Sequence, residues 1–453
     1  MLADVVQVSR EGRTHPASPL VKAGRVVVGL VGVAVVNLRG AEQFGRWLPL
    51  IGVGLAALAA VASYMSWAFT TYRIADGDVR VSSGVLVKRV RRVRIDRLQA
   101  IDVVQPLFAR MLGLAELKLD MAGGAEGRVA IAYLRLADAQ ALRASLLAMA
   151  AGLDHRTPEA PERPLAQVKT GAVVGGALLS TAALLAFCWI AVVLAVAFAS
   201  RSLGIVGVAL PGVLGVVAPL WQTIQAHANF TVADSPDGLR LRHGLLETRA
   251  QTVPPGRVQA VRVVQPLVWR LPGWVRVEAN IAGYAGRRAD EGHHHNSTLL
   301  PVGSRAQADV ILARVLPGID ISDVDMRRVP SRARWRSPLR WWTFRAGSND
   351  QVFVVRSGVL TSVRAVMRHE KIQSVALSVG PLQRLLRLGT LHVHSTHGPV
   401  DVIAPDRDIA EARRLLDEEA TRARQGRAAA APDRWMSADP AAETGVQFRG
   451  STP

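Results

Sequence analysis

The sequence predicts a membrane protein in which two α-helical hairpins, four spanning helices in all, carry three copies of a small β-rich domain closed by a helix. One frame of residues returns three times along the chain, and four long apolar runs are arranged in two pairs. Of the 453 residues 49% are hydrophobic but only 5% are aromatic, because the apolar excess lies in blocks of Val, Ala, Leu and Gly. Lipid-facing helices have this kind of composition.

The repeated frame runs from a glycine to a glutamine, then through a proline to a second glycine. The first glycine and the glutamine are 15 positions apart in every copy, and each glutamine follows a basic residue and an apolar one. A fixed frame of this kind is the signature of a repeated structural unit. We therefore expect structural roles for the frame residues, which are Gly84, Gln99, Pro106 and Gly113 in the first copy, Gly244, Gln259, Pro266 and Gly273 in the second, and Gly358, Gln373, Pro381 and Gly389 in the third.

Each frame also predicts its local structure. Proline suits the first turn of a helix and glycine the position after its end, so short helical turns are expected at Pro106–Leu112, Pro266–Pro272 and Pro381–Leu388. Apolar residues then alternate with polar ones, as at Ala115 and Leu117, which is the period of a half-buried strand. A helix-like segment closes each copy, at Asp138–Met149, Ser304–Leu316 and Asp406–Arg424.

Four apolar runs predict the membrane spans, in two hairpins. About 20 apolar residues are needed to cross a hydrocarbon core of roughly 30 Å. Leu20–Leu38 and Trp47–Phe69 form the first pair, and Thr170–Ala199 and Leu203–Ile224 form the second. A cleaved signal peptide is the alternative for the first run, but a second run follows almost at once and no small-residue cleavage site stands out.

The expected order of parts follows from these runs and frames. It is a flexible N-terminus at 1–19, a hairpin at 20–69, a domain at 70–150, a linker at 151–168, a hairpin at 169–226, domains at 227–318 and 331–424, and a disordered tail at 425–453. Lys and Arg crowd the outer flanks of the hairpins and are scarce at their tips. By the positive-inside rule, both termini and all three domains are expected in the cytoplasm of a multi-pass cell-membrane protein.

Stretches of all three copies resemble the bacterial pleckstrin-homology-like (PH-like) membrane proteins of the YdbS/YdbT type. The resemblance is carried by YRIADGDVRVSSGVL and RIDRLQAIDVVQPLFARMLGLAELKLDMAGG in the first copy, HGLLETRAQTVPPGRVQAVRVVQPLVWRLPG in the second and RSGVLTSVRAVMRHEKIQSVALSVGPLQRLLRLGTLHVHSTHG in the third. The order of a span pair, a domain, a span pair and two further domains is similar to that of the larger, YdbT-like members. The resemblance implies that each copy is a PH-like domain, a bent antiparallel sheet with a C-terminal helix, and it brings no catalytic residues.

The densest cluster of charge lies between the first frame glycine and its glutamine. Basic residues at a cytoplasmic leaflet gain roughly 1 kcal/mol each from anionic lipid. A strand edge whose charges only prevent edge-to-edge pairing is the alternative interpretation. The other two copies do not repeat the cluster, which favours a lipid- or partner-binding site. Its members are Lys88, Arg89, Arg91, Arg92, Arg94 and Arg97.

A second candidate site lies at Arg332–Phe344, where basic residues and indole rings alternate. No apolar hairpin precedes the third copy, so Trp341 and Trp342 are candidates to anchor this domain at the membrane interface. The alternative is that both rings belong to the core of the domain's first strand.

The remaining residues form no catalytic or metal-binding pattern. The sequence contains no nucleophile elbow, P-loop or paired catalytic motif, and a single cysteine cannot form a Cys-based metal site. His392, His394 and His397 lie on a polar strand face, and His293–His295 stand in an insertion. No metal and no cofactor are therefore expected.

The expected function is binding rather than catalysis. The formal charge of +19 would suit nucleic acid or an anionic membrane, and the scarcity of aromatic rings to stack on bases favours the membrane. We expect a non-enzymatic scaffold that binds lipid or protein. A second copy of the chain, or the smaller PH-like membrane protein that the resemblance suggests, would be its protein partner. A transport, efflux or toxin-resistance component is the alternative, although the spans hold almost no ionisable residues of the kind transporters use.

Overall fold

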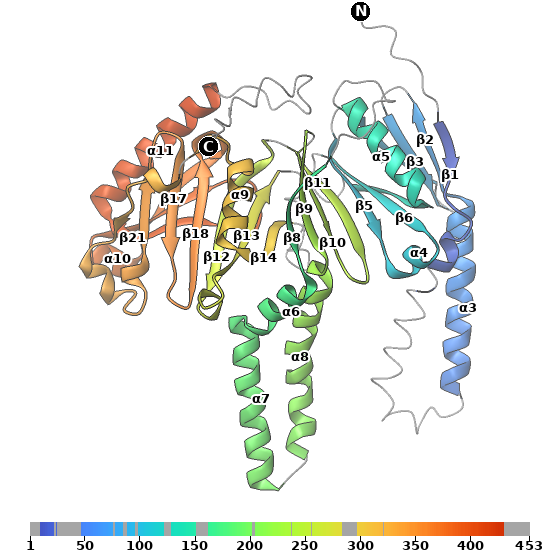
Figure 1. Cartoon of the computed structure of the whole chain (residues 1–453), viewed down its shortest axis with the longest axis horizontal. Coiled ribbons are helices and arrows are strands. Elements are labelled where there is room, and N and C mark those ends of the chain that lie inside the picture. Colours follow the sequence, from blue (N-terminus) through green and yellow to red (C-terminus); the bar gives the residue numbers. More distant parts are fainter. Residues whose placement is uncertain are drawn as a thin grey trace, which may run out of the picture. The chain divides into compact units, whose positions relative to one another are not determined.

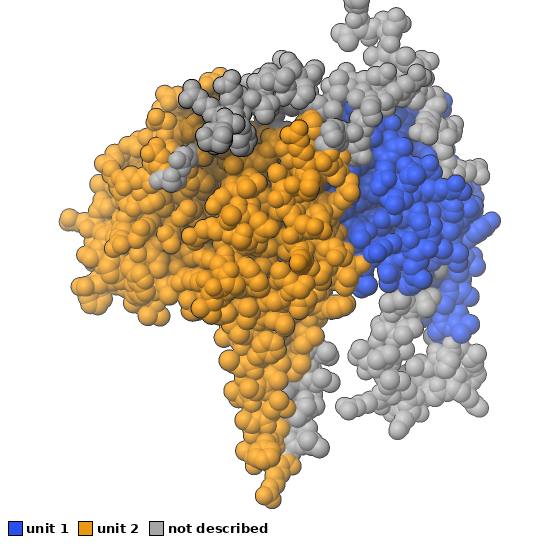
Figure 2. Space-filling view, in the orientation of Figure 1, with its two compact units in different colours: residues 1–159, 246–251 blue, residues 160–245, 252–453 orange. Residues whose placement is uncertain are grey.

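The structure of the chain is a computed structural model. It describes residues 10–21, 24, 47–75, 78–84, 88–95, 98–121, 128–150, 162–201, 204–236, 238–254, 256–282, 297–319 and 321–429. The chain forms two compact units (Figure 2). Unit 1 holds Met1–Glu159 and Leu246–Gln251, and unit 2 holds Ala160–Leu245 and Thr252–Pro453.

The first copy of the repeat forms two antiparallel sheets and a closing helix in unit 1 (Figure 1). The first sheet contains, in spatial order, β1 (Arg10–Arg13), β2 (Thr71–Ala75), β3 (Asp78–Ser83) and β4 (Arg89–Arg94). The second sheet contains β5 (Leu98–Gln105), β6 (Leu114–Met121) and β7 (Arg128–Arg135). The helices are α3 (Trp47–Ala68) before β2, α4 (Leu107–Met111) between β5 and β6, and α5 (Leu136–Ala150), which packs over the second sheet.

Unit 2 repeats this plan in the second and third copies. The strands of the second copy are β8 (Arg163–Val168), β9 (Phe230–Ser235), β10 (Gly238–His243), β11 (Thr248–Val253), β12 (Val258–Pro266), β13 (Trp274–Ile281) and β14 (Thr298–Ser304). Those of the third copy are β15 (Arg327–Arg328), β16 (Arg345–Ser348), β17 (Val352–Ser357), β18 (Thr361–Arg368), β19 (Ser374–Ser378), β20 (Leu388–His394) and β21 (Val402–Asp408).

The helices of unit 2 either lie between strands of one copy or close it. The second copy has α6 (Thr170–Leu178), α7 (Thr181–Ser200), α8 (Gly204–His227), η4 (Val268–Arg270) and the closing helix α9 (Arg305–Val315). The third copy has η7 (Ile321–Asp323), η8 (Ser331–Trp335), η9 (Trp341–Thr343), η10 (His369–Lys371), α10 (Pro381–Leu385) and the closing helix α11 (Ile409–Ala429).

The strand after the short helix packs as its period of two predicts. Ala115, Leu117 and Leu119 of β6 are fully buried, and Leu391 and Val393 take the same places in β20. Burial of one face alone sets the register of such a strand, because a slip of one residue would expose every apolar side chain. The closing helix covers this sheet in each copy, since α5, α9 and α11 each contact strands of their own second sheet.

The apolar helices are insertions within a repeat and do not lie between repeats. β8 pairs with β9 although α6, α7 and α8 separate them in the chain, and β1 pairs with β2 across a similar interval. β15 pairs with β16 across η8 and η9. The first two copies therefore begin earlier than expected, because Arg10–Arg13 and Arg163–Val168 are strands of the segments expected to be a flexible N-terminus and a linker.

Successive copies are joined by strand pairing in a constant register. In unit 2, β12 pairs along its length with β18, which places Gln265 opposite Ser362 in one seven-stranded sheet. In unit 1, the start of β11 pairs with β5 and places Thr248 opposite Gln105. These pairs occupy the same positions of the frame. The second and third copies therefore lie in one body, unit 2, apart from the start of β11.

A second contact fastens the third copy to the second. The side chain of Asn280, on β13, is buried and bonds both backbone groups of Val400 at 2.8 Å, as acceptor from its N–H and as donor to its C=O. Gly398 allows this close approach, because a Cβ at that position would lie 2.1 Å from Oδ1 of Asn280.

Pro381 and Gly389 lie one and two positions further from the frame glutamine than their counterparts in the first copy, which suggests inserted residues. The structure shows no such insertion. The strand pairs place Gly380 and Arg387 at the positions of Pro106 and Gly113 in the first copy. Arg387 has a φ of 52° and so adopts the left-handed conformation that Gly113 adopts with a φ of 65°. Gly389 packs closely, because a Cβ there would lie 2.9 Å from Cδ1 of Leu377, an atom at the end of a flexible side chain.

The prediction of four spanning helices is wrong. In the described part of the chain one helix, α7, is long and apolar enough to cross a membrane, and Gly52–Ala68 within α3 is a shorter apolar helix. Most of the predicted run Leu20–Leu38 lies outside the described residues. Three β-rich copies do agree with the predicted fold class.

The prediction of Thr170–Ala199 as one spanning helix is wrong, because this range forms two helices, α6 and α7. The break comes at Ser180, whose Oγ accepts a hydrogen bond from the N–H of Ala183 at 3.2 Å and caps α7. The preceding helix, α6, packs on the second copy, where Nε1–H of Trp269 donates to the C=O of Gly176 at 3.1 Å. α6 therefore belongs to the β-rich body of unit 2.

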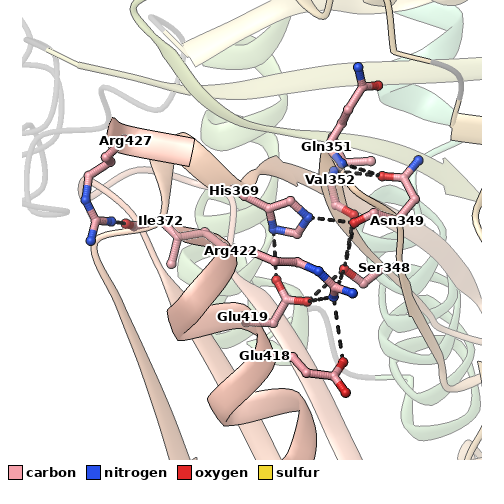
Figure 3. Close-up of polar contacts among 10 residues, drawn as sticks. All are labelled: Ser348, Asn349, Gln351, Val352, His369, Ile372, Glu418, Glu419, Arg422 and Arg427. Carbon is pink, nitrogen blue, oxygen red and sulfur yellow. Dashed lines mark hydrogen bonds and ion pairs between the residues drawn. The ribbon is translucent and has the colours of Figure 1, made fainter. Parts of the chain in front are cut away.

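A buried polar cluster holds α11 to the first sheet of the third copy (Figure 3). The carboxylate of Glu419 is fully buried and accepts a hydrogen bond from Oγ of Ser348 at 2.7 Å; it also lies 2.9 Å from Nδ1 of His369 and 3.1 Å from Arg422. Burial alone would raise the pKa of Glu419, but the contacts with His369, Ser348 and Arg422 hold that pKa below its ordinary value. The ionised carboxylate thus helps to fix α11 in place.

Candidate functional site

The predicted basic residues lie on and beside β4, the edge strand of the first sheet in unit 1. Lys88, Arg89, Arg91, Arg92 and Arg94 are all exposed, and Arg97 lies outside the described residues. Neighbouring residues of a strand point to opposite faces, so charge covers both faces of β4. This arrangement suits an edge that must stay solvated or meet an anionic surface.

A buried carboxylate gives one of these arginines a structural role. Nε of Arg92 donates to the buried Asp78 at 2.6 Å, and Arg80 lies 3.8 Å from the same carboxylate. We call Asp78, Arg80 and Arg92 the cap triad. Counted from the frame glycine, the cap triad takes the places that Val352, Val354 and Val366 hold in the third copy.

The cap triad and the three valines of the third copy have different surroundings. The three valines are buried in a cluster with Leu316 and Val324, which follow α9, the closing helix of the preceding copy. In the first copy, Arg80 and Arg92 hold two of these places and are exposed. A polar outer face of this kind is typical of a terminal repeat. Asp78 was not among the predicted site residues; the signal for it is a charged residue six positions before the frame glycine, where the third copy has Val352.

The predicted indole segment forms η8 and η9, where the second copy has α6, α7 and α8. The structure separates its two candidates. Trp342 is exposed, as is Trp335, whereas Trp341 is half-buried and packs against a cluster that contains Phe344. Trp342 therefore suits contact outside the domain, while Trp341 contributes to packing.

A carboxylate that the sequence analysis did not single out holds this segment in place. Asp406 is fully buried and accepts hydrogen bonds from Arg336 at 2.6 Å, Ser337 at 3.1 Å and Gln383 at 2.8 Å. Its partners lie 23 to 70 positions away in the chain, which is why periodicity gave no signal for it.

The same segment forms one wall of a pocket of about 510 Å³ in the third copy. Arginine and serine side chains stand beside apolar ones, and the guanidinium of Arg340 lies 5.5 Å above the ring of Phe344. Pockets of this size accept small ligands, and arginine suits anionic groups. The lining comprises Arg336, Ser337, Arg340, Phe344, Val355, Ser357, Val363, Ala365, Asp401, Ile403 and Pro405.

The histidines of the third copy do not assemble a metal centre. The rings of His392 and His394 stack on one face of β20 with centroids 6.0 Å apart, and His392 bonds to Oγ of Ser378 at 2.9 Å. Burial and the neighbouring His394 lower the pKa of His392, against the opposite effect of Asp401. Among the described residues no group of three His, Cys, Asp or Glu could hold a metal ion, and His293–His295 lie outside them.

The frame glutamines and glycines take varied structural roles. Gln259 donates to the C=O of Arg257 at 3.3 Å, and Gln373 is exposed with its N–H bonded to the backbone of β20. The side chain of Gln99 lies outside the described residues. The first glycine of each frame, at Gly84, Gly244 and Gly358, has a positive φ, as Gly273 does.

α7 is the described element best suited to lipid. Its side chains of Leu185, Val192 and Phe198 are 67%, 60% and 88% exposed, and none of its residues is charged. α8 runs against it, because Gly212 lies where a Cβ would be 2.5 Å from the ring of Trp189. Exposed apolar surface of this extent marks a protein or membrane interaction.

The class of protein is defined by a unit that occurs three times. Each copy has two sheets, a short connecting helix and a closing helix. Residues 26–150, 175–318 and 300–422 each match the family model of the bacterial PH domain, and the chain belongs to this family. It is also similar to UPF0699 transmembrane protein YdbT of Bacillus subtilis (strain 168), with 22% identity over 368 residues, 72% of this chain and 73% of that protein. No solved structure matches the chain. The resemblance inferred from the sequence is confirmed.

Proposed function

We propose that this chain is a non-enzymatic membrane scaffold whose bacterial PH domains bind anionic lipid or another protein. The observation that carries the proposal is α7, a 20-residue helix with large apolar side chains exposed along its length and no charge. Water would solvate that surface at a high free-energy cost, whereas the hydrocarbon of a bilayer would not. Similarity to a transmembrane protein supports the same location.

The topology of unit 2 suits an insertion of α7 and α8 as a hairpin. β8 ends at Val168 and β9 begins at Phe230, and these two residues are strand partners. The chain therefore leaves the sheet and returns to it at one place, so the β-rich body of unit 2 lies on one side of the membrane. The many Lys and Arg residues outside the hairpin favour the cytoplasmic side.

Two surfaces support a binding role. The exposed side chains of Arg89, Arg91 and Arg94 on β4 would attract an anionic leaflet, and the pocket beside Arg336 and Arg340 would accept an anionic group next to apolar surface. The protein partner we propose is a smaller PH-like membrane protein or a second copy of this chain. α7 holds no Asp, Glu, Lys, Arg or His residue, so nothing in it favours transport.

The native cysteine tests the location of α7. Cys188 is the single cysteine of the chain, and it is exposed on α7. In full-length protein placed in lipid nanodiscs, a polar maleimide should leave Cys188 unlabelled until detergent dissolves the bilayer. A Cys188→Ser, His397→Cys variant provides the accessible control, because His397 is exposed in the β20–β21 turn. Equal labelling of both cysteines in intact nanodiscs would refute the membrane location.

A charge-removal series tests the lipid-binding role of β4. Arg89, Arg91 and Arg94 changed together to Gln would lose roughly 1 kcal/mol each, which is about a hundredfold in affinity for an anionic leaflet. Titration of the full-length protein, held in phosphatidylcholine nanodiscs, with vesicles that contain phosphatidylglycerol measures this. The control removes equal charge from Arg413, Arg414 and Arg424 on α11, all exposed. Equal affinities of the two variants would remove β4 as a lipid site.

A further inference from the structure

The short helix before the buried strand of each second sheet shows one pattern in all three copies. Counted from the frame glutamine, the tenth residue is buried, the eleventh is an exposed arginine and the twelfth is a large, exposed apolar residue. The buried residues are Ala109, Trp269 and Gln383. We call the exposed pairs the interfacial tips: Arg110–Met111, Arg270–Leu271 and Arg384–Leu385.

The apolar member of each tip is exposed to an unusual degree. Met111, Leu271 and Leu385 are 76%, 88% and 80% exposed, among the highest values for large apolar residues in the described ranges. A single exposed leucine on a protein surface is ordinary. The same position exposed in three copies, each time beside an arginine, requires a common cause. The fold accounts for the tenth residue, which packs into the domain, and for Arg270, which donates to the C=O of Val359 at 2.9 Å, but not for the exposed apolar twelfth residue.

In unit 2 one tip lies at the base of the membrane helix. Trp269, which precedes Arg270, donates its indole N–H to the C=O of Gly176, five positions before α7 begins at Thr181. The Arg270–Leu271 tip is therefore fixed beside α6, the helix that leads into α7.

The other tip of unit 2 lies at the same end. Figure 1 shows α10 and the β17–β18 turn at the end of unit 2 from which α7 and α8 extend. This turn adjoins η4, because the N–H of Leu267 donates to the C=O of Leu360 at 2.6 Å. Leu267, Leu360 and Leu382 are themselves 47%, 58% and 46% exposed. Apolar side chains from both copies thus lie at the end of the body from which α7 and α8 extend.

We propose that the interfacial tips are peripheral membrane contacts, in which the apolar side chain enters the head-group boundary and the adjacent arginine binds lipid phosphate. The proposal rests on the proposed membrane location of α7. Apolar side chains flanked by Arg are typical of segments that insert about 5–10 Å into this boundary, and arginine binds phosphate through paired donors.

The tips have a particular consequence for the third copy. This copy has η8 and η9 where the second has its membrane helices, so no helix of its own passes into the bilayer. The Arg384–Leu385 tip, together with exposed Trp342 on η9, holds it against the membrane surface. The scaffold then lies along the bilayer and does not extend from one anchor into solvent.

Fluorescence quenching in full-length protein tests this placement. On a Cys188→Ser background, Leu271→Cys and Leu385→Cys place an environment-sensitive dye at the two tips of unit 2. His397→Cys places it in the turn at the opposite end of β20, whose first residue, Leu388, adjoins α10. The protein is placed in nanodiscs of phosphatidylcholine and phosphatidylglycerol, with or without a quencher on the acyl chains, placed near the head group for the tips and at mid-chain for Cys188. Dye on native Cys188 reports α7 in parallel.

We expect blue-shifted emission and loss of intensity in quencher lipid at both tips and at Cys188, but not at His397. Quenching at Cys188 with none at either tip would overturn the tip proposal and leave the membrane location intact. No quenching at Cys188 would refute the membrane location itself. Iodide, a quencher dissolved in the water, is added in a parallel measurement. If neither iodide nor the lipid quencher reaches the dye at the tips, a protein surface covers them, which also overturns the proposal.

Discussion

Removal of the Asn280 side chain should release the third copy from the second at the β20–β21 turn. Asn280 and Val400 are 2% and 4% exposed, and both of their mutual hydrogen bonds are 2.8 Å long. Asn280→Ala leaves the N–H and the C=O of Val400 buried without partners. Each unsatisfied group costs about 1–3 kcal/mol, so local opening should become easier by about 2–6 kcal/mol.

Hydrogen–deuterium exchange of the full-length protein measures this opening directly. Because 1.4 kcal/mol corresponds to a factor of ten, the amide of Val400 should exchange at least about thirtyfold faster in Asn280→Ala. Ser395→Ala is the matched control, since it removes two 3.3 Å bonds at the edge of the same contact, one from Asn280 and one to the C=O of Thr396, and leaves both bonds of Val400 in place. Exchange at Val400 that changes by less than about tenfold in Asn280→Ala would refute the reasoning that this bond pair fastens the copies.

Three further changes test other contacts. Changing all three cap-triad residues to Val should give the first copy the apolar face of the third, so the protein should self-associate in light scattering; a variant that stays at the parent mass argues against the cap. Gly176→Val would meet Val302 at 2.6 Å and should loosen α6, seen as a red shift of Trp fluorescence, whereas Gly171→Ala, with open space, should not. Glu419 has a lowered pKa, so it contributes stability above about pH 4.5 that is lost as the pH falls through its folded pKa. Thermal unfolding of Glu419→Gln should lose that acid-side dependence, and an unchanged pH profile would contradict it.

Local sequence patterns predicted most of the β-rich architecture. The fixed distance between frame glycine and glutamine predicted three copies, and alternation at Ala115 and Leu117 predicted the buried face of β6. Both signals depend on residues only a few positions apart. The basic run was equally visible, but its meaning depended on Asp78, whose burial is a tertiary property.

The spans were the weakest part of the prediction for the same reason. Composition alone cannot tell a helix that faces lipid from one that packs on a protein surface. Thr170–Ala199 is apolar throughout, yet its first part packs on the second copy through a contact between Gly176 and Trp269, which are 93 positions apart.

From its sequence alone this protein is determined to be a threefold repeat of strands and closing helices with apolar helical segments, because backbone propensity and side-chain period act within a few residues. Tertiary structure alone decided that β12 and β18 share a sheet, that α6 is part of the β-rich body and that the first copy ends in a charged cap. These outcomes depend on which distant surfaces meet and exclude water, and no local pattern encodes that.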